Sequence, residues 1–341
     1  MQKAMEGKPV TIYDIAKKAG VSASSVSRVV NNKPGVNPET REKIKKLLKE
    51  YNYVANEAAR GLVTKSNRMV GILISDIRSI HLTEGVWEIT RILSSKGYCT
   101  LILNTGNTDE GRAEGVRTME ERSVDALILM GSMFENPRVQ EAIVQYMPGK
   151  PVFIMNGYLN LPNVQGVVSN ERSGIHSCVD LLAQKGRRRL CYISDNMSRI
   201  SSRSKKLGFQ EGIRANYGED IPYYIYENVS ADMTGGFGAM MKALHEHPDI
   251  DGVICSMDIL ACGALQAIRE AGRSVPRDIS VIGVDNSEFA ETCYPRLTSL
   301  DNMIIESSVE ISTRVISNLE GSPSSVRKIM LFTRIMERDT T

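Results

Sequence analysis

The sequence has no run of about 18 consecutive apolar residues, the length at which a transmembrane helix is predicted. Its N-terminal segment also lacks the apolar stretch of a signal peptide. Cysteine is sparse: six residues are scattered without a CxxC spacing. We therefore expect a cytoplasmic protein with reduced thiols, and neither disulfides nor a cysteine-bound metal.

The motifs of common enzymes are missing as well. No GxGxxG follows the first predicted strand and GxxxxGK[ST] occurs nowhere, so neither a dinucleotide site nor a P-loop is predicted. The four histidines include no pair on one helix face, because His176 and Cys178, like His245 and His247, are two residues apart. No nucleophile and base can be paired from their spacing. The sequence favours a binding protein without metal or cofactor over an enzyme.

Positive charge is concentrated at one end of the chain. Residues 1–65 hold 13 Lys and Arg against 6 Asp and Glu, a net charge of +7, whereas the remainder carries a net charge of −5. A basic segment joined to a mildly acidic body is typical of a nucleic-acid-binding module attached to a second unit. A solvated basic tail is the alternative, but the helical pattern inside this segment argues against it.

That pattern, over residues 11–31, predicts two short helices joined by a tight turn. Apolar residues recur at i, i+3, i+4 and i+7 in the first helix, at Ile12, Ile15, Ala16 and Ala19. Thr11 and Asp14 have the spacing of a capping box, and Gly20 ends the helix. The second helix leaves short side chains and Arg28 on its outer face, which suits insertion into a DNA major groove. A third helix is predicted from Asn37-Pro38.

From Met69 onward, short apolar runs alternate with helical segments. Two such series predict two similar lobes, each with a parallel sheet covered on both faces. Ligands of open parallel sheets bind at the carboxyl ends of the strands. This rule selects residues at the predicted strand ends as candidates: Ser75, Asp76, Asn104, Met130, Gly131, Asn156, Ser194, Asp195, Asp258 and Asp285.

Three blocks in order, VTIYDIAKKAGVSASSVSRVVN, VNPETREKI and NEAARGLVTK, resemble the DNA-binding headpiece of the LacI/GalR (lactose/galactose repressor) family. The resemblance implies an all-α helix-turn-helix headpiece over 9–55 and a hinge over 56–66. It implies an α/β core over 67–341 with the two-lobed fold of type I periplasmic binding proteins, built on two Rossmann-like parallel sheets. The implied N-lobe covers about 67–166 and 299–325, and the C-lobe about 167–298 and 326–338.

The resemblance also implies which residues touch DNA. Ala23 and Ser24 match base-reading positions, and Arg28 matches an arginine that reads guanine or clamps the backbone. Contacts to phosphates, which fix the register without reading sequence, are implied for Thr11, Ser22, Ser27 and Asn31. Tyr53 packs on the helices or reaches a phosphate. Ordinary solvent-facing surface is the alternative for Ser24 and Ser27.

In the family, the hinge folds on the operator and pushes a leucine into the minor groove, where it partly unstacks one base step. Leu62 matches that leucine, and Asn56 and Ala59 on the same segment are further implied DNA contacts. A plain linker leucine is the alternative. Gly61 lies inside this short segment, where glycine costs roughly 1 kcal/mol relative to alanine, so we expect a hinge that depends strongly on operator contact.

Three motifs of the core match the family's effector-binding segments: SSRSKKLGF, SMDILACGALQAIREAG and VIGVDNSE. They imply Arg203, Asp258 and Asp285 as effector contacts, because an arginine or a carboxylate can engage two neighbouring hydroxyls at once. His81 is expected at the mouth of the cleft. The alternative is a helix N-cap for Asp258 and a lobe-stabilising salt bridge for Arg203 and Asp285.

These features predict a sequence-specific transcriptional regulator, in the first interpretation a repressor, that binds a palindromic DNA operator as a homodimer. The leucine-heptad tail of the tetrameric relatives is absent, which favours a dimer. A small effector in the inter-lobe cleft, a sugar in the first interpretation, controls DNA binding. A nucleobase or other metabolite acting as corepressor is one alternative, and a ligand-independent architectural DNA binder is another.

Overall fold

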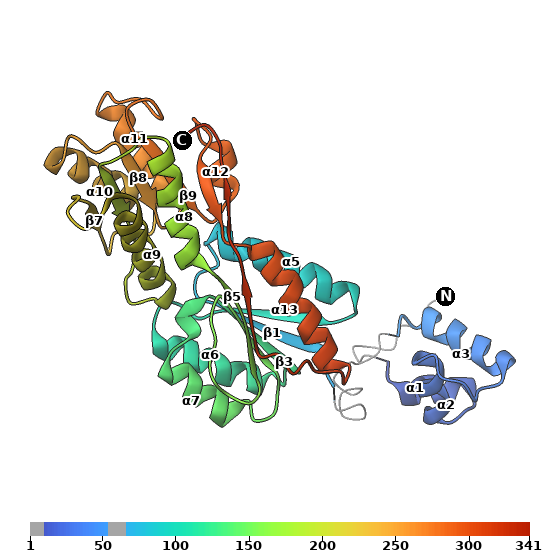
Figure 1. Ribbon diagram of the computed structural model, residues 1–341. Coiled ribbons are helices and arrows are strands. Elements are labelled where there is room, and N and C mark those ends of the chain that lie inside the picture. Colours follow the sequence, from blue (N-terminus) through green and yellow to red (C-terminus); the bar gives the residue numbers. More distant parts are fainter. Residues whose placement is uncertain (1–9, 54–65) are drawn as a thin grey trace. The chain divides into compact units, whose positions relative to one another are not determined.

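The computed structural model describes residues 10–53 and 66–341, and the chain divides into two compact units between Asn67 and Arg68 (Figure 1). The hinge residues Asn56, Ala59 and Leu62 lie outside the described residues. Within the described ranges, no helix is both long and apolar enough to span a bilayer.

The headpiece consists of three short helices, α1 (Ile12–Ala19), α2 (Ala23–Val30) and α3 (Pro38–Glu50). Helix α1 starts with the predicted capping box, in which Thr11 and Asp14 each bond the backbone N–H of the other. It ends at Gly20, whose φ of 71° requires a residue that tolerates the left-handed region. Ile15, Val26 and Ile44, one from each helix, are fully buried together and form the centre of the small core.

The N-lobe is built on a six-stranded sheet in the order β11-β5-β4-β3-β1-β2, all of its pairs parallel. Helices α5 and α13 cover one face, and α6 and α7 cover the other. The elements are β1 (Met69–Ile74), α5 (Ile80–Ser95), β2 (Cys99–Asn104), α6 (Asp109–Glu121), β3 (Ala126–Met130), the 3-10 helix η1 (Ser132–Phe134), α7 (Pro137–Tyr146), β4 (Val152–Met155), β5 (Val164–Ser169), α13 (Ile304–Leu319) and β11 (Lys328–Leu331).

The C-lobe repeats this plan with a six-stranded sheet in the order β12-β10-β9-β8-β6-β7. Helices α8 and α9 cover one face, and α10 and α11 cover the other. The elements are α8 (Glu171–Gln184), β6 (Leu190–Ile193), α9 (Ile200–Tyr217), β7 (Tyr224–Tyr226), α10 (Met233–Glu246), β8 (Gly252–Cys255), α11 (Asp258–Glu270), β9 (Ser280–Val284), α12 (Glu288–Thr292), β10 (Thr298–Asp301) and β12 (Arg334–Met336). The two-sheet α/β fold predicted from the sequence is confirmed, although β12 runs antiparallel to β10.

The lobe limits differ from those predicted. Strand β10 pairs with β9 and stays in the C-lobe, whereas the prediction moved the chain to the N-lobe at residue 299. The segment 326–338, which the prediction assigned to the C-lobe, contains two strands in two different sheets, because β11 pairs with β5 and β12 pairs with β10. Strand β10 has the largely polar sequence TSLD although all four of its residues are buried, so an apolar pattern does not predict it. The sequence pattern of a strand also does not indicate which sheet the strand joins. The chain therefore passes between the lobes after β5, after β10 and after β11.

Candidate functional site

The outer face of α2 is the candidate DNA-reading surface of the headpiece. Ser22 caps the helix by accepting from the N–H of Ser25, and Ser24 and Arg28 are exposed. The buried valines 26 and 29 face the other way, toward α1 and α3. This placement leaves a short polar helix face, of the kind that enters a major groove.

The remaining predicted DNA contacts are engaged within the headpiece to different degrees. Thr11 is exposed, and its hydroxyl donates to the Asp14 carboxylate at 2.6 Å. Asn31 donates from Nδ2 to the Ser27 carbonyl at 2.8 Å, which holds the end of α2. Ala23 and Tyr53 are half-buried against the headpiece core. The packing of Tyr53 matches the first of its two predicted roles.

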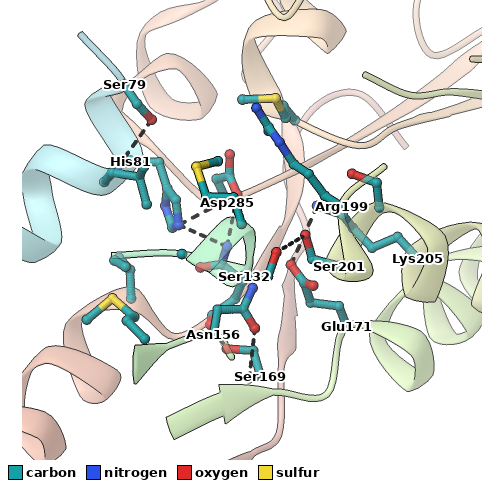
Figure 2. Close-up of a pocket in the computed structure, with 18 of the residues that line it drawn as sticks. Ser79, His81, Ser132, Asn156, Ser169, Glu171, Arg199, Ser201, Lys205 and Asp285 are labelled. Carbon is teal, nitrogen blue, oxygen red and sulfur yellow. Dashed lines mark hydrogen bonds and ion pairs between the residues drawn. The ribbon is translucent and has the colours of Figure 1, made fainter. Parts of the chain in front are cut away.

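A polar cavity of about 100 Å³ lies between the two lobes at the carboxyl ends of their strands (Figure 2). A second, larger space of about 520 Å³, here called the mouth, adjoins this inner cavity and shares several lining residues with it. The N-lobe contributes the start of α5 and the residues after β3, β4 and β5. The C-lobe contributes the start of α9 and the residues after β6, β8, β9 and β10. Sequence reasoning from strand ends thus locates the region of the cavity.

Hydrogen bonds cross the cavity from one lobe to the other. The hydroxyls of Ser132, after β3, and Ser201, on α9, lie 2.9 Å apart. On the other side, Asn302 donates from Nδ2 to Asp285 Oδ1 at 2.9 Å and lies 3.1 Å from Nε2 of His81 on α5. The arrangement of the lobes and the contacts inside the cavity therefore depend on each other.

Two ion pairs line the C-lobe side. Arg199 lies 2.7 Å from the buried Asp195 carboxylate. Lys205 and Glu171, whose side chains are 8% and 4% exposed, lie 3.5 Å apart, and Lys205 also donates to the Ser256 carbonyl at 3.2 Å. Although burial alone would lower it, the pKa of Lys205 is raised by the carboxylates of Glu171, Asp285 and Asp195. The lysine is therefore charged, and its charge is neutralised within the chain.

Their surroundings disfavour the charged forms of Asp285 and His81. Burial, with the negative charges of Glu171, Asp195 and Glu84, raises the pKa of Asp285, and the positive charge of Lys205 only partly opposes this rise. Burial, assisted by Lys205, lowers the pKa of His81 to about 4. Asp285 also has a φ of 108°, an unusual backbone conformation for a residue other than glycine. Such strained positions concentrate at functional sites.

Seven of the predicted candidate residues lie at the cleft, and Gly131 and Asp195 are two of them. His81, Asn156 and Asp285 line the inner cavity, and Asn156 reaches its place through a left-handed backbone, with a φ of 52°. Ser75 and Asp76 line the mouth. Asp76 binds Arg78, whose hydrogen bonds lower the pKa of the Asp76 carboxyl to about 2.

Ser194, which is fully buried, and four further predicted residues lie outside the cavity lining. Asn104 is exposed and accepts from the Ile77 N–H, which fixes the loop after β1. Met130 is fully buried in the core beneath α5. Asp258 accepts hydrogen bonds from the N–H and hydroxyl of Ser287 and from the Ser299 hydroxyl, and so connects α11 to the residues after β9 and to β10. It is not the N-cap of α11, because Met257 occupies that position.

Arg203 is the last of these residues. It is exposed and donates to the carbonyls of Met197 and Ser198. The buried face of α9 carries Ser202, Lys205 and Phe209, and one step along a helix turns the side chain by roughly 100°. Arg203 therefore points away, and Arg199, one turn earlier, lines the cavity in its place.

Sequence reasoning missed most of the polar residues that complete the cavity. They are Ser79, Ser132, Ser169, Glu171, Arg199, Ser201, Ser202, Lys205 and Asn302. A signal existed for Lys205, because it interrupts an otherwise small and apolar helix face. Asn302 follows β10, whose polar sequence does not predict a strand, so the rule on strand ends gives no candidate at this position. Among the described residues, no group of three His, Cys, Asp or Glu side chains is placed to hold a metal ion.

Two family models match the chain. Residues 11–56 match the model for bacterial regulatory proteins of the lacI family, and residues 179–341 match a periplasmic binding protein-like domain. An HTH-type transcriptional regulator of Lachnoclostridium phytofermentans is 29% identical over 86% of this chain and 89% of its own length. The ribose operon repressor of Halalkalibacterium halodurans is 27% identical over 97% of both chains.

A solved structure shares the fold over nearly the whole chain. The lac repressor dimer, bound to operator and the anti-inducer ONPF, superimposes with a TM-score of 0.88 at 24% identity, over 98% of this chain and 99% of that one. A helix-turn-helix headpiece joined to a two-lobed core with a polar cleft defines a class of ligand-responsive DNA-binding regulators. The chain belongs to the LacI family of bacterial regulatory proteins and is a DNA-binding transcriptional regulator.

Proposed function

We propose that the protein is a repressor that binds a palindromic operator as a homodimer and is controlled by a sugar bound between the two lobes of its core. The observation that supports this most directly is the polar cavity, because hydrogen bonds cross it from Ser132 to Ser201 and from His81 to Asn302. A ligand that replaces or reinforces these bonds shifts the equilibrium between lobe arrangements. With DNA as its partner, we expect the protein in the cytoplasm.

The coupling needs only a difference in effector affinity between the DNA-competent lobe arrangement and the other one. An effector that prefers the competent arrangement acts as a corepressor, and one that prefers the other acts as an inducer. In the headpiece, Ala23 and Ser24 contact base edges, and Arg28 reads guanine or clamps the backbone. Contacts to phosphates come from Thr11, Ser22, Ser27 and Asn31.

The test is a thermal-unfolding screen of the purified protein against free sugars, sugar phosphates, nucleobases and amino acids. A ligand at about 100 times its Kd adds roughly 2.7 kcal/mol to the free energy of unfolding, which raises Tm by several degrees. Helix α9 offers a matched pair of variants, Arg199→Ala inside the cavity and Arg203→Ala outside it. We expect a sugar to stabilise the wild type and Arg203→Ala, and to lose most of its effect on Arg199→Ala.

Operator binding is measured separately, by selecting DNA from a random-sequence pool and repeating the binding with the hit from the screen. We expect the selected sites to be inverted repeats and their affinity to change when the hit is added. Stabilisation by a nucleobase alone would replace the sugar with the alternative effector. Inverted-repeat binding that no compound in the panel changes would favour the ligand-independent DNA binder.

A further inference from the structure

The charges that line the inner cavity are already balanced within the chain. Two cations face it, Arg199 and Lys205, and each is paired with a carboxylate, Asp195 at 2.7 Å and Glu171 at 3.5 Å. The third carboxyl group, on Asp285, faces the neutral amide of Asn302. Figure 2 shows Arg199, Lys205, Glu171 and Asp285 around one space. No cation in this lining is left for an anionic ligand.

An anion entering this cavity would meet three carboxyl groups at close range. Burying a charge without a partner is costly, and breaking a buried ion pair to supply one is costly too. The starts of α5 and α9 line the cavity, but a helix N-terminus carries only about half a positive charge. That is less than the double negative charge of a phosphate ester near neutral pH.

Two buried polar atoms in the cavity wall have no partner among the described residues. They are Nδ1 of His81 and Oδ1 of Asn302. The two protons on Asn302 Nδ2 serve Asp285 Oδ1 and His81 Nε2, which makes Nε2 an acceptor and assigns the ring proton to Nδ1. Among the described residues, one donor, the Nδ1–H of His81, and one acceptor, the Oδ1 of Asn302, are thus left unpaired beside the cavity.

A hydroxyl group both donates and accepts a hydrogen bond, whereas an ionised phosphate oxygen only accepts. The rest of the lining is rich in hydroxyls, at Ser79, Ser132, Ser169, Ser201, Ser202 and Ser307. We propose that this cavity selects an uncharged polyhydroxyl compound, a free sugar or polyol, over its phosphate ester, with His81 and Asn302 reading one hydroxyl between them. This inference rests on the proposed effector role of the cleft.

The test is calorimetric titration of the full-length protein with matched pairs: ribose and ribose 5-phosphate, glucose and glucose 6-phosphate, fructose and fructose 6-phosphate. We expect the free member of at least one pair to bind at least 10-fold more tightly than its ester. Tighter binding of an ester would overturn the inference and leave the proposed repressor intact. Operator binding that responds to a nucleobase alone would overturn both the sugar effector and this inference.

The role of charge balance is tested with variants that remove the carboxylate partner of Lys205 or of Arg199, one at a time. Glu171→Gln frees Lys205 in the interior, and Asp195→Asn frees Arg199 nearer the mouth, so the two variants probe the same idea at two places. We expect either variant to shift the ratio of ester to free-sugar affinity toward the ester by at least 10-fold. Asp180→Asn, in a half-exposed carboxylate on α8 outside the cavity lining, is the control that leaves the ratio unchanged.

Folding of each variant is checked by its thermal transition, and a variant without a cooperative transition is set aside in favour of the other. An unchanged ratio in a folded variant would show that the paired cations do not decide selectivity.

The proposed contact between His81 and a ligand hydroxyl is tested separately. His81→Ala should weaken binding of the free sugar about 10-fold or more, and His81→Gln should restore part of the affinity, because glutamine keeps a neutral donor and acceptor. Equal affinities for wild type and His81→Ala would remove His81 from the inference.

Discussion

The buried carboxyl group of Asp285 makes the stability of the folded protein depend on pH. It is 8% exposed and lies among other carboxylates, so its pKa is raised to about 8 in the folded protein. The unfolded chain holds such a group near its ordinary pKa of about 3.9. Between these values the folded state binds the extra proton, so this residue's contribution to stability falls as pH rises. His81 acts in the opposite sense below about pH 6.5, because its pKa is lowered on folding.

We therefore predict that the free energy of unfolding declines between pH 6.5 and 8, and that Asp285→Asn makes the decline shallower. One carboxyl group contributes at most about 1.4 kcal/mol per pH unit. Asp258, whose pKa burial also raises, contributes with the same sign, so part of the slope should persist. Urea unfolding of wild type and variant at both pH values measures it. Parallel slopes for the two proteins would mean that Asp285 is ionised throughout this range.

The sequence predicts only some of the residues that line the cavity. The strand-end rule found Asp285 and Asn156, because parallel strands bring their carboxyl ends to one edge. It failed for Met130, whose side chain turns into the core although its strand ends at the cavity. Whether a side chain at a strand end points up, back or sideways depends on packing partners far away in sequence, and no local pattern contains that information.

At the scale of elements, the turn between α1 and α2 depends on one glycine. Gly20 has a φ of 71°, and a Cβ added there would meet no atom within 4 Å. A substitution is therefore penalised by backbone conformation alone, by about 1 kcal/mol. We predict that Gly20→Ala destabilises the headpiece by this amount without any clash.

The matched control is Gly238→Ala, inside α10, where an added Cβ also meets nothing within 4 Å but no positive φ is required. There alanine should stabilise the helix by roughly 0.5–1 kcal/mol. Hydrogen exchange of the headpiece amides in the full-length chain measures the first change, and urea unfolding of the core measures the second. Equal protection of the headpiece in wild type and Gly20→Ala would contradict the prediction.

Helices were easier to anticipate than strands in this chain. Caps such as Thr11, Asp14 and Gly20 are local, so the headpiece helices could be placed from their own residues. Strand partners are not local: β10 and β12 join one sheet, while β11, between them in sequence, joins the other. The choice of arginine also differs from the prediction, because Arg199, the N-cap that precedes α9, lines the cavity and Arg203, on the helix itself, does not.

At the scale of the whole molecule, the headpiece and the core are separate compact units. Of the residues that the structure describes, those that line the inner cavity all belong to the core. We predict that a fragment spanning residues 68–341 binds the effector with a Kd within about twofold of the full-length value and has no operator affinity. Calorimetric titration and a DNA mobility-shift measurement on the two proteins provide the comparison. Loss of effector binding by the folded fragment would show that headpiece or hinge residues complete the site.

The order of the strands also sets the order in which the parts of a newly made chain can form. One edge strand of each sheet, β11 in the N-lobe and β12 in the C-lobe, lies at residues 328–331 and 334–336. The N-lobe sheet cannot be completed before residue 331 has left the ribosome, and the C-lobe sheet cannot be completed before residue 336 has. The headpiece core, in contrast, uses residues within the first 53. At about 5–20 residues per second, a nascent chain carries its headpiece helices for roughly 15–60 seconds before both sheets of the core can be completed.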